Sequence, residues 1–262
     1  MDERHRDREK YFKEQSYTTE KYVIPFIHES LVLSPDLNIA EIGCGEGGNL
    51  KPFLDIGCKI TGIDLAENKI SNAYKFFIDH PKKNNLTLIA EDIYKVNPDE
   101  LLPFDLVMLR DTLEHIHDQN SFLGYLKKFI KPTGKIYIAF PPWRMPFGGH
   151  QQMCENRFLS KMPYFHILPN FLYTGILKLF GEKESKIKAL LEIKETGISI
   201  SGFKRILKER KYQIDKETFY LINPNYEIKF KSKPRILPEV LNIPFIREFF
   251  TTTYYCIISS RD

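Results

Sequence analysis

The 262-residue chain lacks the marks of a disulfide-stabilised, zinc-binding or membrane-spanning protein. Its four cysteines are scattered without C-x-x-C spacing, so neither a disulfide framework nor a metal site is expected. The longest apolar stretches, such as 171–180, reach about half of the ~20 residues that span a bilayer. The charged first ten residues lack the apolar segment of a secretory signal. We therefore expect a cytoplasmic protein with reduced thiols, no transmembrane segment and no metal.

Charge of one sign does not dominate the chain, but it is distributed unevenly. Thirty-eight Lys and Arg against 34 Asp and Glu give a net charge of +4. Residues 1–142 carry 18 basic and 22 acidic residues, a net charge of −4, whereas residues 143–262 carry 20 and 12, a net charge of +8. The lysines are dispersed, which favours a solvated basic face over a nucleic-acid-binding surface.

Apolar runs alternate with helical patterns along most of the chain. Buried strands are predicted at 37–42, 59–64, 86–90, 104–109 and 135–140. Helices are predicted at 21–33, 48–55, 66–80 and 121–130, with a turn at 131–134. A helix at 201–211 and strands at 218–222 and 252–259 follow an irregular stretch. This alternation predicts a doubly wound α/β fold with a mostly parallel sheet.

The same pattern divides the chain into four parts. We expect an N-terminal segment (1–35) that closes the ligand site and a nucleoside-binding core (36–142). An insertion or lid (143–198) should cover the side of that site where a second substrate, the acceptor, would bind, and residues 199–262 form the C-terminal part of the sheet. The insertion follows the fifth strand. It should therefore lie near the carboxyl ends of the strands, where folds of this class bind their ligands.

A glycine loop follows the first predicted strand. Residues 41–48 read Glu-Ile-Gly-Cys-Gly-Glu-Gly-Gly, and Asp64 lies 21 residues after Gly43 at the end of the second strand. This spacing is typical of a nucleoside-binding turn with an acidic partner for the ribose. A dinucleotide would bring an anionic pyrophosphate to the loop, where Glu41 and Glu46 would repel it. The acids instead suit the sulfonium and ammonium groups of S-adenosyl-L-methionine.

The segment Glu41-Ile-Gly43-Cys-Gly45-Glu-Gly47 resembles motif I of the class I S-adenosylmethionine-dependent methyltransferases. Later segments resemble that family's further motifs in the same order: Gly62-Ile-Asp64-Leu, Ala90-Glu-Asp92-Ile, Phe104-Asp-Leu-Val, Arg110-Asp-Thr-Leu-Glu-His115-Ile, and Lys131-Pro-Thr-Gly-Lys135. The resemblance covers residues 36–142 and the terminal strands. It implies a seven-stranded sheet of order 3-2-1-4-5-7-6 with a reversed last hairpin.

The resemblance also implies a set of cofactor contacts. Glu41, Gly43, Cys44 and Gly45 would meet the methionine end of the cofactor, and Asp64 and Leu65 its ribose. Glu91, Asp92 and Ile93 would meet the adenine, and the backbone near Leu109 and Arg110 the sulfonium. Tyr17 is the candidate for an N-terminal aromatic that closes the pocket.

Two histidines are candidates for the chemistry. Methyl transfer from a sulfonium mainly requires alignment of the two reactants, and a general base helps when the acceptor is a hydroxyl. His115, four positions after Asp111, is the first candidate base, and His150, in the Pro- and Gly-rich loop after the fifth strand, is the second. The simpler interpretation is that each histidine only packs or caps.

The sequence predicts a methyltransferase that acts on oxygen or nitrogen of a small-molecule or glycan-type acceptor. The alternatives are an RNA-directed methyltransferase, an NAD-dependent oxidoreductase and a non-catalytic sensor of S-adenosylmethionine. An Asn-Pro-Pro-Tyr segment, expected for base amino-methylation, does not occur. The acceptor and the oligomeric state are left open.

Overall fold

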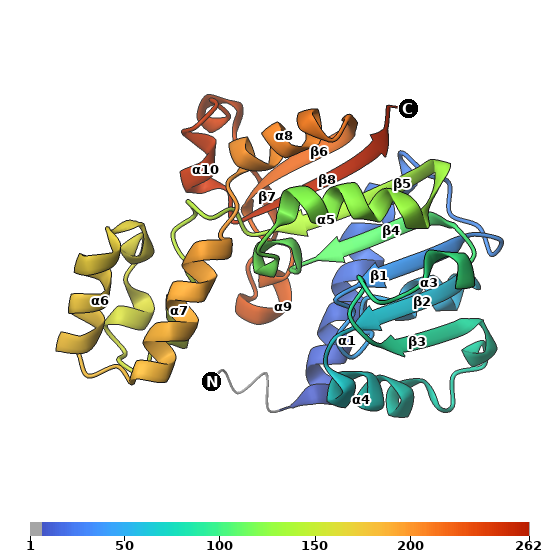
Figure 1. Cartoon of the computed structure of the whole chain (residues 1–262), viewed down its shortest axis with the longest axis horizontal. Coiled ribbons are helices and arrows are strands. Elements are labelled where there is room, and N and C mark those ends of the chain that lie inside the picture. The colour runs from blue at the N-terminus through green and yellow to red at the C-terminus, as the bar shows by residue number, and fades with distance from the viewer. Residues whose placement is uncertain (1–6, 262) are drawn as a thin grey trace.

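The computed structural model describes residues 7–261 and contains one eight-stranded sheet flanked by helices (Figure 1). Its strands are β1 Asn38–Ile42, β2 Lys59–Asp64, β3 Leu86–Ala90, β4 Phe104–Arg110, β5 Ile130–Phe140, β6 Tyr212–Ile222, β7 Arg235–Ile236 and β8 Thr253–Ser260. The order across the sheet is β3-β2-β1-β4-β5-β8-β6-β7. Strands β1 to β5 run parallel, and β8 pairs antiparallel with both β5 and β6. The predicted α/β class and reversed hairpin are confirmed, and the short β7 adds an eighth strand.

Helices cover both faces of the sheet. The helices within residues 7–261 are α1 Arg8–Thr18, α2 Ile24–His28, α3 Lys51–Ile56, α4 Glu67–Phe77, α5 Gln119–Leu126, α6 Asn170–Leu179, α7 Glu184–Thr196, α8 Ile200–Glu209, α9 Tyr226–Phe230 and α10 Arg247–Phe250, of which α1 to α5 and α8 pack on the sheet. In the central strand β4, Leu106 and Met108 pack into one core, beside α1 to α4, while Val107 and Leu109 pack into the other, beside α5 and α8. Alternation of side chains along a strand therefore gives the sheet two buried faces.

The N-terminal helix differs from the prediction of a polar segment followed by a helix at 21–33. Helix α1 already begins at Arg8 and continues through a π-helical turn, Thr19–Val23, into α2. Phe12 holds α1 against α4, with its ring centroid 4.7 Å from that of Phe76 and 5.5 Å from that of Phe77. A single aromatic anchor carries little periodic signal, so local sequence did not reveal this helix. Residues 1–6 of the expected segment lie outside the described residues.

Strands β5 and β6 begin earlier than predicted. Strand β5 begins at Ile130, so the turn expected at 131–134 is instead part of the strand. Its register with β4 shifts between the pairs Phe104–Ile130 and Leu106–Lys135, and such irregular pairing accommodates Pro132 and Gly134. Strand β6 begins at Tyr212, and its polar residues hid its first half because it lies near the edge of the sheet.

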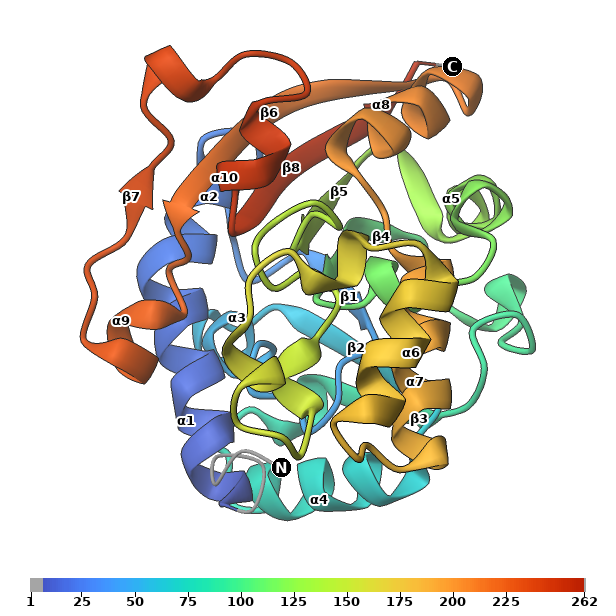
Figure 2. The ribbon, with the colours of Figure 1, turned by 90° about the vertical axis from the view of Figure 1, so that its left-hand side faces the viewer.

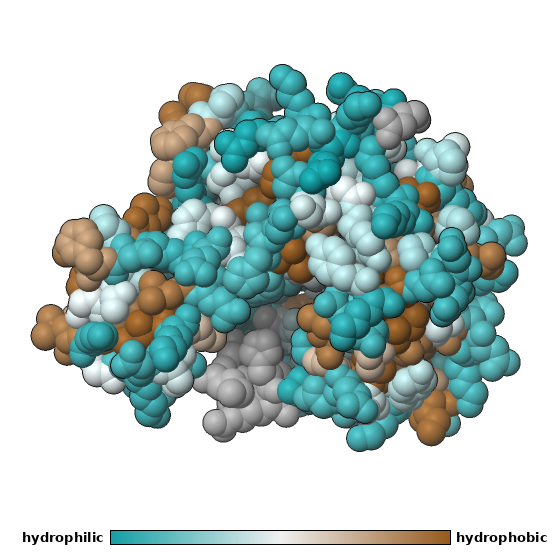
Figure 3. Space-filling model, in the orientation of Figure 1, coloured by the Kyte–Doolittle hydropathy of each residue, from teal (hydrophilic) through white to brown (hydrophobic). Residues whose placement is uncertain are grey.

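The stretch 143–198, predicted to be irregular, contains two helices and a small core of its own. Tyr173 and Leu177 of α6 pack with Ile187 and Leu190 of α7. Figure 2 looks onto the carboxyl ends of β1 to β4, and α6, α7 and the 143–168 segment lie in front of them. Phe171 and Leu179 of α6 are exposed by 74% and 81%. Figure 3 shows apolar side chains among polar ones on the surface over α6. No helix within residues 7–261 is both long enough and apolar enough to cross a membrane.

Candidate active site

A cavity of about 530 Å³ lies at the carboxyl ends of β1 to β4. Parallel strands place their ends at one edge of the sheet, so residues far apart in sequence meet there. The cavity is lined by Ile42, Gly43, Ile63, Asp64, Leu65, Lys69, Glu91, Asp92, Ile93, Tyr94, Asp111, Thr112, His115, Ile116, His117, Asp118 and Phe122. Six of the predicted cofactor residues (Gly43, Asp64, Leu65, Glu91, Asp92 and Ile93) and the first candidate base, His115, are among them.

The glycine loop has the backbone conformation that its composition predicts. Gly43, Gly45 and Gly47 have φ angles of +75°, +57° and +79°, a region that favours glycine. A Cβ on Gly43 would lie 2.5 Å from Oγ1 of Thr112, which follows β4. The close approach of the loop to the end of β4 therefore requires a residue without a side chain at position 43.

Asp64 connects the loop to the cavity. Its Oδ2 accepts a hydrogen bond from the Gly45 N–H at 2.8 Å, and its Oδ1 accepts one from the Ala66 N–H at 2.8 Å. Lys69 Nζ lies 3.7 Å from Oδ2. Each carboxylate oxygen can accept a further hydrogen bond. Asp64 is thus fixed in place by the backbone and still has acceptor capacity for a ligand hydroxyl.

Two adjacent acidic residues, Glu91 and Asp92, directly follow β3. Oδ1 of Asp92 accepts from the Tyr94 N–H at 3.0 Å, and Oε1 of Glu91 accepts from the Asp92 N–H at 2.9 Å. The bend that follows β3 places Ile93 and Tyr94 in the cavity wall. Apolar and aromatic side chains next to an acceptor suit an adenine ring, which has a flat apolar face and an amino group at its edge.

Glu41 and Arg110 lie behind the glycine loop. With Thr19, Val23, Asn49, Met108 and Tyr137 they enclose a space too small to hold a water molecule. Arg110 donates to the side-chain oxygens of Thr19 and Asn49 at 2.8 and 2.7 Å, and also to Oδ1 of Asn225. Asn49 in turn donates to Oε1 of Glu41 at 2.7 Å. This buried network ties β4 to the N-terminal helix, the loop after β1 and the segment before α9.

Burial raises the pKa of Glu41 to about 8, although Asn49 and the Arg110 guanidinium act in the opposite direction. Its Oε2 is buried without a hydrogen-bond partner among the described residues. Of the remaining predicted cofactor residues, Cys44 and Leu109 are buried, with their side chains in the two cores, and Gly45 contributes its N–H to Asp64.

Tyr17 lies away from this cavity. Its hydroxyl donates to Oε2 of Glu227 at 3.2 Å and accepts from Lys21 Nζ at 2.7 Å, joining α1 to α9. It lines a different surface depression with Asp7, Lys10, Lys13 and Ile228. The structure therefore shows Tyr17 as a contact between α1 and α9 rather than as part of the cavity wall.

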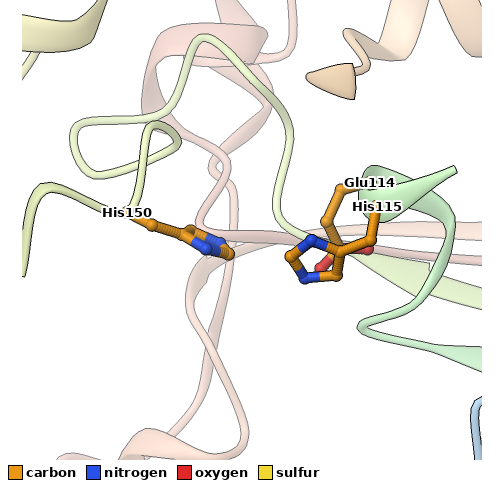
Figure 4. Close-up of side chains that lie close together, drawn as sticks. All are labelled: Glu114, His115 and His150. Atoms are coloured by element: carbon orange, nitrogen blue, oxygen red, sulfur yellow. The ribbon is translucent and has the colours of Figure 1, made fainter. Parts of the chain in front are cut away.

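The two candidate bases meet at the rim of the cavity. His115 belongs to a 3-10 turn, Leu113–His115, and its ring centroid lies 5.4 Å from that of His150 (Figure 4). Partial burial lowers the pKa of both imidazoles, that of His150 to about 4. The adjacent Glu114 is buried, and burial together with Asp111 raises the pKa of its carboxyl well above the usual value.

The loop that carries His150 is held rigidly. His150 has a φ angle of +52°, and Nε2 of the buried Gln151 donates to the carbonyl oxygens of Pro146 and Met162 at 2.9 and 3.1 Å. The Trp143 ring packs at 4.5 Å between centroids against His166. Gln151 and Trp143 thus fix the loop, while His150 points toward His115 (Figure 4).

Sequence reasoning did not single out Lys69, Tyr94, Asp111, Thr112 and Phe122 as cavity residues. Asp111 and Thr112 directly follow β4, and strand ends in this fold are a signal that could have found them. Lys69 and Phe122 lie on helices, and only packing brings them to the cavity. Five carboxylates (Asp64, Glu91, Asp92, Asp111 and Asp118) and one lysine line the wall, which favours a cationic ligand.

Comparisons with known proteins identify the family of the chain. Residues 15–167 match the family model described as a methyltransferase domain. The chain is 29% identical to a ubiquinone biosynthesis O-methyltransferase of Bartonella tribocorum over 70% of this chain and 73% of that protein. It is 32% identical to one of Rhodopseudomonas palustris, a match that spans 42% of each protein.

Solved structures show the same fold. Magnesium protoporphyrin IX methyltransferase from Synechocystis PCC 6803, with bound S-adenosylhomocysteine, superposes with a TM-score of 0.56 at 13% identity, covering 94% of this chain and 83% of that one. A plantazolicin methyltransferase gives a TM-score of 0.57 at 13% identity, covering 98% and 93%.

The fold, the glycine loop and the acidic cavity beside it define a class I S-adenosylmethionine-dependent methyltransferase, with S-adenosylmethionine as its cofactor. Because the family model matches more than half of its length, the chain belongs to the methyltransferase domain family.

Proposed function

We propose that this methyltransferase transfers the methyl group to a hydroxyl oxygen of a small-molecule acceptor. The observation that carries the proposal is the position of His115, which lines the cofactor cavity, with His150 beside it. The similarity to two ubiquinone biosynthesis O-methyltransferases supports oxygen as the acceptor atom. The α6–α7 insertion in front of the cavity would then contact the rest of the acceptor.

The cofactor would occupy the cavity in a single orientation. We propose that Asp64 and Leu65 hold the ribose and that Glu91, Asp92 and Ile93 hold the adenine. Gly43, Cys44 and Gly45 would follow the methionine chain, with its ammonium near Glu41 and its sulfonium near the backbone of Leu109 and Arg110. The tight loop and the buried acid support this orientation, because both suit a cationic chain that passes close to the backbone.

The reaction would be an in-line displacement. A lone pair of the acceptor oxygen forms the new O–C bond while the C–S bond breaks, and its electron pair stays on sulfur as a neutral thioether. The hydroxyl proton goes to an imidazole nitrogen of His115 or, as the second candidate, of His150. Alignment of oxygen, carbon and sulfur would supply most of the rate, on the order of 7–11 kcal/mol of the barrier.

The proposal is tested by supplying S-adenosylmethionine labelled with carbon-13 in its methyl group. Phenolic small molecules, soluble glycans and RNA are offered in parallel, and the methyl carbon of the product is observed by NMR. A methyl ether on a small molecule is the expected product. An N-methyl or C-methyl signal, or transfer to glycan or RNA alone, would refute the assignment. RNA binding would also weaken steeply between low and moderate salt.

The histidines are tested separately. His115→Asn should lower kcat by roughly 10²–10⁴-fold with unchanged affinity for S-adenosylmethionine, because the base acts on the acceptor. His150→Asn tests the second candidate in the same way, and asparagine tolerates its positive φ. His28→Asn, on α2 far from the cavity, is the control and should retain full activity.

We also propose a reducing, cytoplasmic setting for the enzyme. All four cysteines are free and buried, and burial raises the pKa of each thiol. A raised pKa keeps the thiols protonated and unreactive, which suits packing residues rather than redox partners. Protein purified without reductant is unfolded under non-reducing conditions, and its thiols are counted in a thiol assay. We expect four accessible thiols per chain.

A further inference from the structure

Three side chains with ligand atoms suited to a metal converge beside the cofactor cavity. Atoms of Glu114, His115 and His150 all lie within 4.8 Å of one another. Glu114 and His115 are neighbours on the 3-10 turn after β4, and His150 comes from the rigid loop after β5 (Figure 4). Two parts of the chain therefore bring two imidazoles and one carboxylate to a single point.

Glu114 lacks the partners that a buried carboxylate normally has. It is only 5% exposed, and its Oε2 has no hydrogen-bond partner among the described residues. No lysine or arginine within residues 7–261 forms an ion pair with it. Burying an unpaired polar oxygen is costly, and each such group in a folded protein requires an explanation. A bound cation between Glu114 and the two imidazoles would supply the missing partner.

The geometry points to a divalent transition-metal site formed by Glu114, His115 and His150. Two nitrogen ligands and one oxygen ligand suit Zn²⁺, Co²⁺ or Fe²⁺ better than Mg²⁺ or Ca²⁺, which prefer oxygen ligands throughout. Three protein ligands leave at least one coordination position open, as in catalytic rather than structural metal sites. Since His115 also lines the cofactor cavity, an acceptor bound in that cavity would lie close to the ion.

Such a cation would change how the acceptor loses its proton. A hydroxyl bound to a divalent metal ionises far more readily than a free one, just as metal-bound water does. The acceptor oxygen would release its proton to solvent water and then attack the methyl carbon as a metal-bound alkoxide or phenolate. In that state His115 and His150 act as ligands, not as bases. This consequence, though not metal binding itself, rests on the proposed O-methyl transfer.

Co²⁺ binding to the full chain tests the site without measuring activity. The protein is treated with EDTA, dialysed and titrated with Co²⁺ by calorimetry and by visible absorption. One Co²⁺ per chain is expected, with d–d absorption bands of a nitrogen- and oxygen-ligated ion. Trp143, the single tryptophan of the chain, lies in the loop that carries His150, so its fluorescence should fall as Co²⁺ binds.

Three variants remove one ligand each: Glu114→Gln, His115→Asn and His150→Asn. Each should weaken Co²⁺ binding by more than the ~10–100-fold that loss of an outer-shell partner causes. His117→Asn is the matched control, because His117 lies two residues from His115 but outside the cluster, and it should bind Co²⁺ normally. Titration of every variant with S-adenosylmethionine shows whether the fold and the cofactor site are intact.

The results separate the metal site from the proposed reaction. Absence of Co²⁺ binding to the wild-type chain, or undiminished binding in any one of the three ligand variants, would overturn the site. Displacement of Co²⁺ by an equal concentration of Mg²⁺ would overturn the assignment to a transition metal. Tight Co²⁺ binding without methylation of any hydroxyl compound would leave the site standing and count against the proposed function.

Discussion

Glu41 should make the stability of this protein depend steeply on pH. In the folded chain burial raises its pKa to about 8, from 4.5 in the unfolded chain. The folded state therefore holds this proton more tightly than the unfolded state does. The resulting stability is fully present below about pH 4.5 and is lost as the pH rises through about 8. The difference of about 3.5 pKa units corresponds to about 5 kcal/mol at most.

Several groups oppose or reinforce this effect. Asn49 donates to the carboxyl and Arg110 attracts its charged form, whereas Asp64 and Asp111 repel it. The raised pKa thus depends on desolvation outweighing the nearby guanidinium. Arg110 is itself engaged by the side-chain oxygens of Thr19 and Asn49, and this leaves it poorly placed to neutralise Glu41 fully.

Urea unfolding of the wild type and of Glu41→Gln between pH 5 and pH 9 measures the effect. Glutamine imitates the protonated acid, and taking the difference between the two proteins cancels other titrating groups. The stability of the variant relative to the wild type should rise by about 1.4 kcal/mol per pH unit up to about pH 8 and level off above it. A difference that stays flat from pH 5 to pH 9 would refute the reasoning, because it would mean that Glu41 is already ionised in the folded chain.

Binding of S-adenosylmethionine should release the proton that the Glu41 carboxyl carries. With a pKa of about 8, Glu41 is roughly 90% protonated at pH 7, and the ammonium that we place beside it would expel that proton. The free ammonium is already mostly charged at pH 7, since α-amino groups titrate near ~7.7–8.0. Calorimetry in buffers of different ionisation enthalpy should therefore show release of nearly one proton by the wild type and of none by Glu41→Gln. No release by the wild type would remove Glu41 from the ammonium site.

Three further substitutions, with Gly175→Ala as a control for the first, test the loop, the ribose site and the insertion. Gly43→Ala should cost about 1–3 kcal/mol of stability from backbone strain alone, and more from the contact with Thr112. Gly175→Ala lies at an exposed position of α6 with open space around it, so it should stabilise the protein by up to ~1 kcal/mol. Denaturant unfolding measures both effects. Asp64→Asn should weaken S-adenosylmethionine binding by about 10-fold or more in a calorimetric titration, since hydrogen bonds to a charged group contribute ~1.5–3 kcal/mol, and unchanged affinity would exclude a ribose contact. Leu190→Ala should destabilise the insertion by about 2–5 kcal/mol and raise the acceptor KM while the cofactor affinity stays the same; loss of cofactor binding would contradict a role limited to the acceptor.

The amino-acid sequence was enough to predict the sheet core and the glycine loop. Strands β2 and β3 lie where their apolar runs predict. Five of the six residues of β2 are buried, which gives it a mostly apolar sequence, whereas in the edge strand β3 only Leu88 is buried. The loop glycines and Asp64 were visible for a similar reason: a positive φ angle and a strand-end acid are local requirements that leave a local signature. These residues, together with those at the end of β3, define the side of the cavity that we assign to the cofactor.

Tertiary structure alone decided the remainder. It placed α1 on α4 through one phenylalanine, folded residues 143–198 into a small helical unit, and buried Glu41 behind the loop beside Arg110. It also brought His150 to Glu114 and His115 across 35 residues of chain. No local pattern encodes such a meeting, because it depends on how the loop after β5 packs against the insertion and on where β4 ends in the sheet.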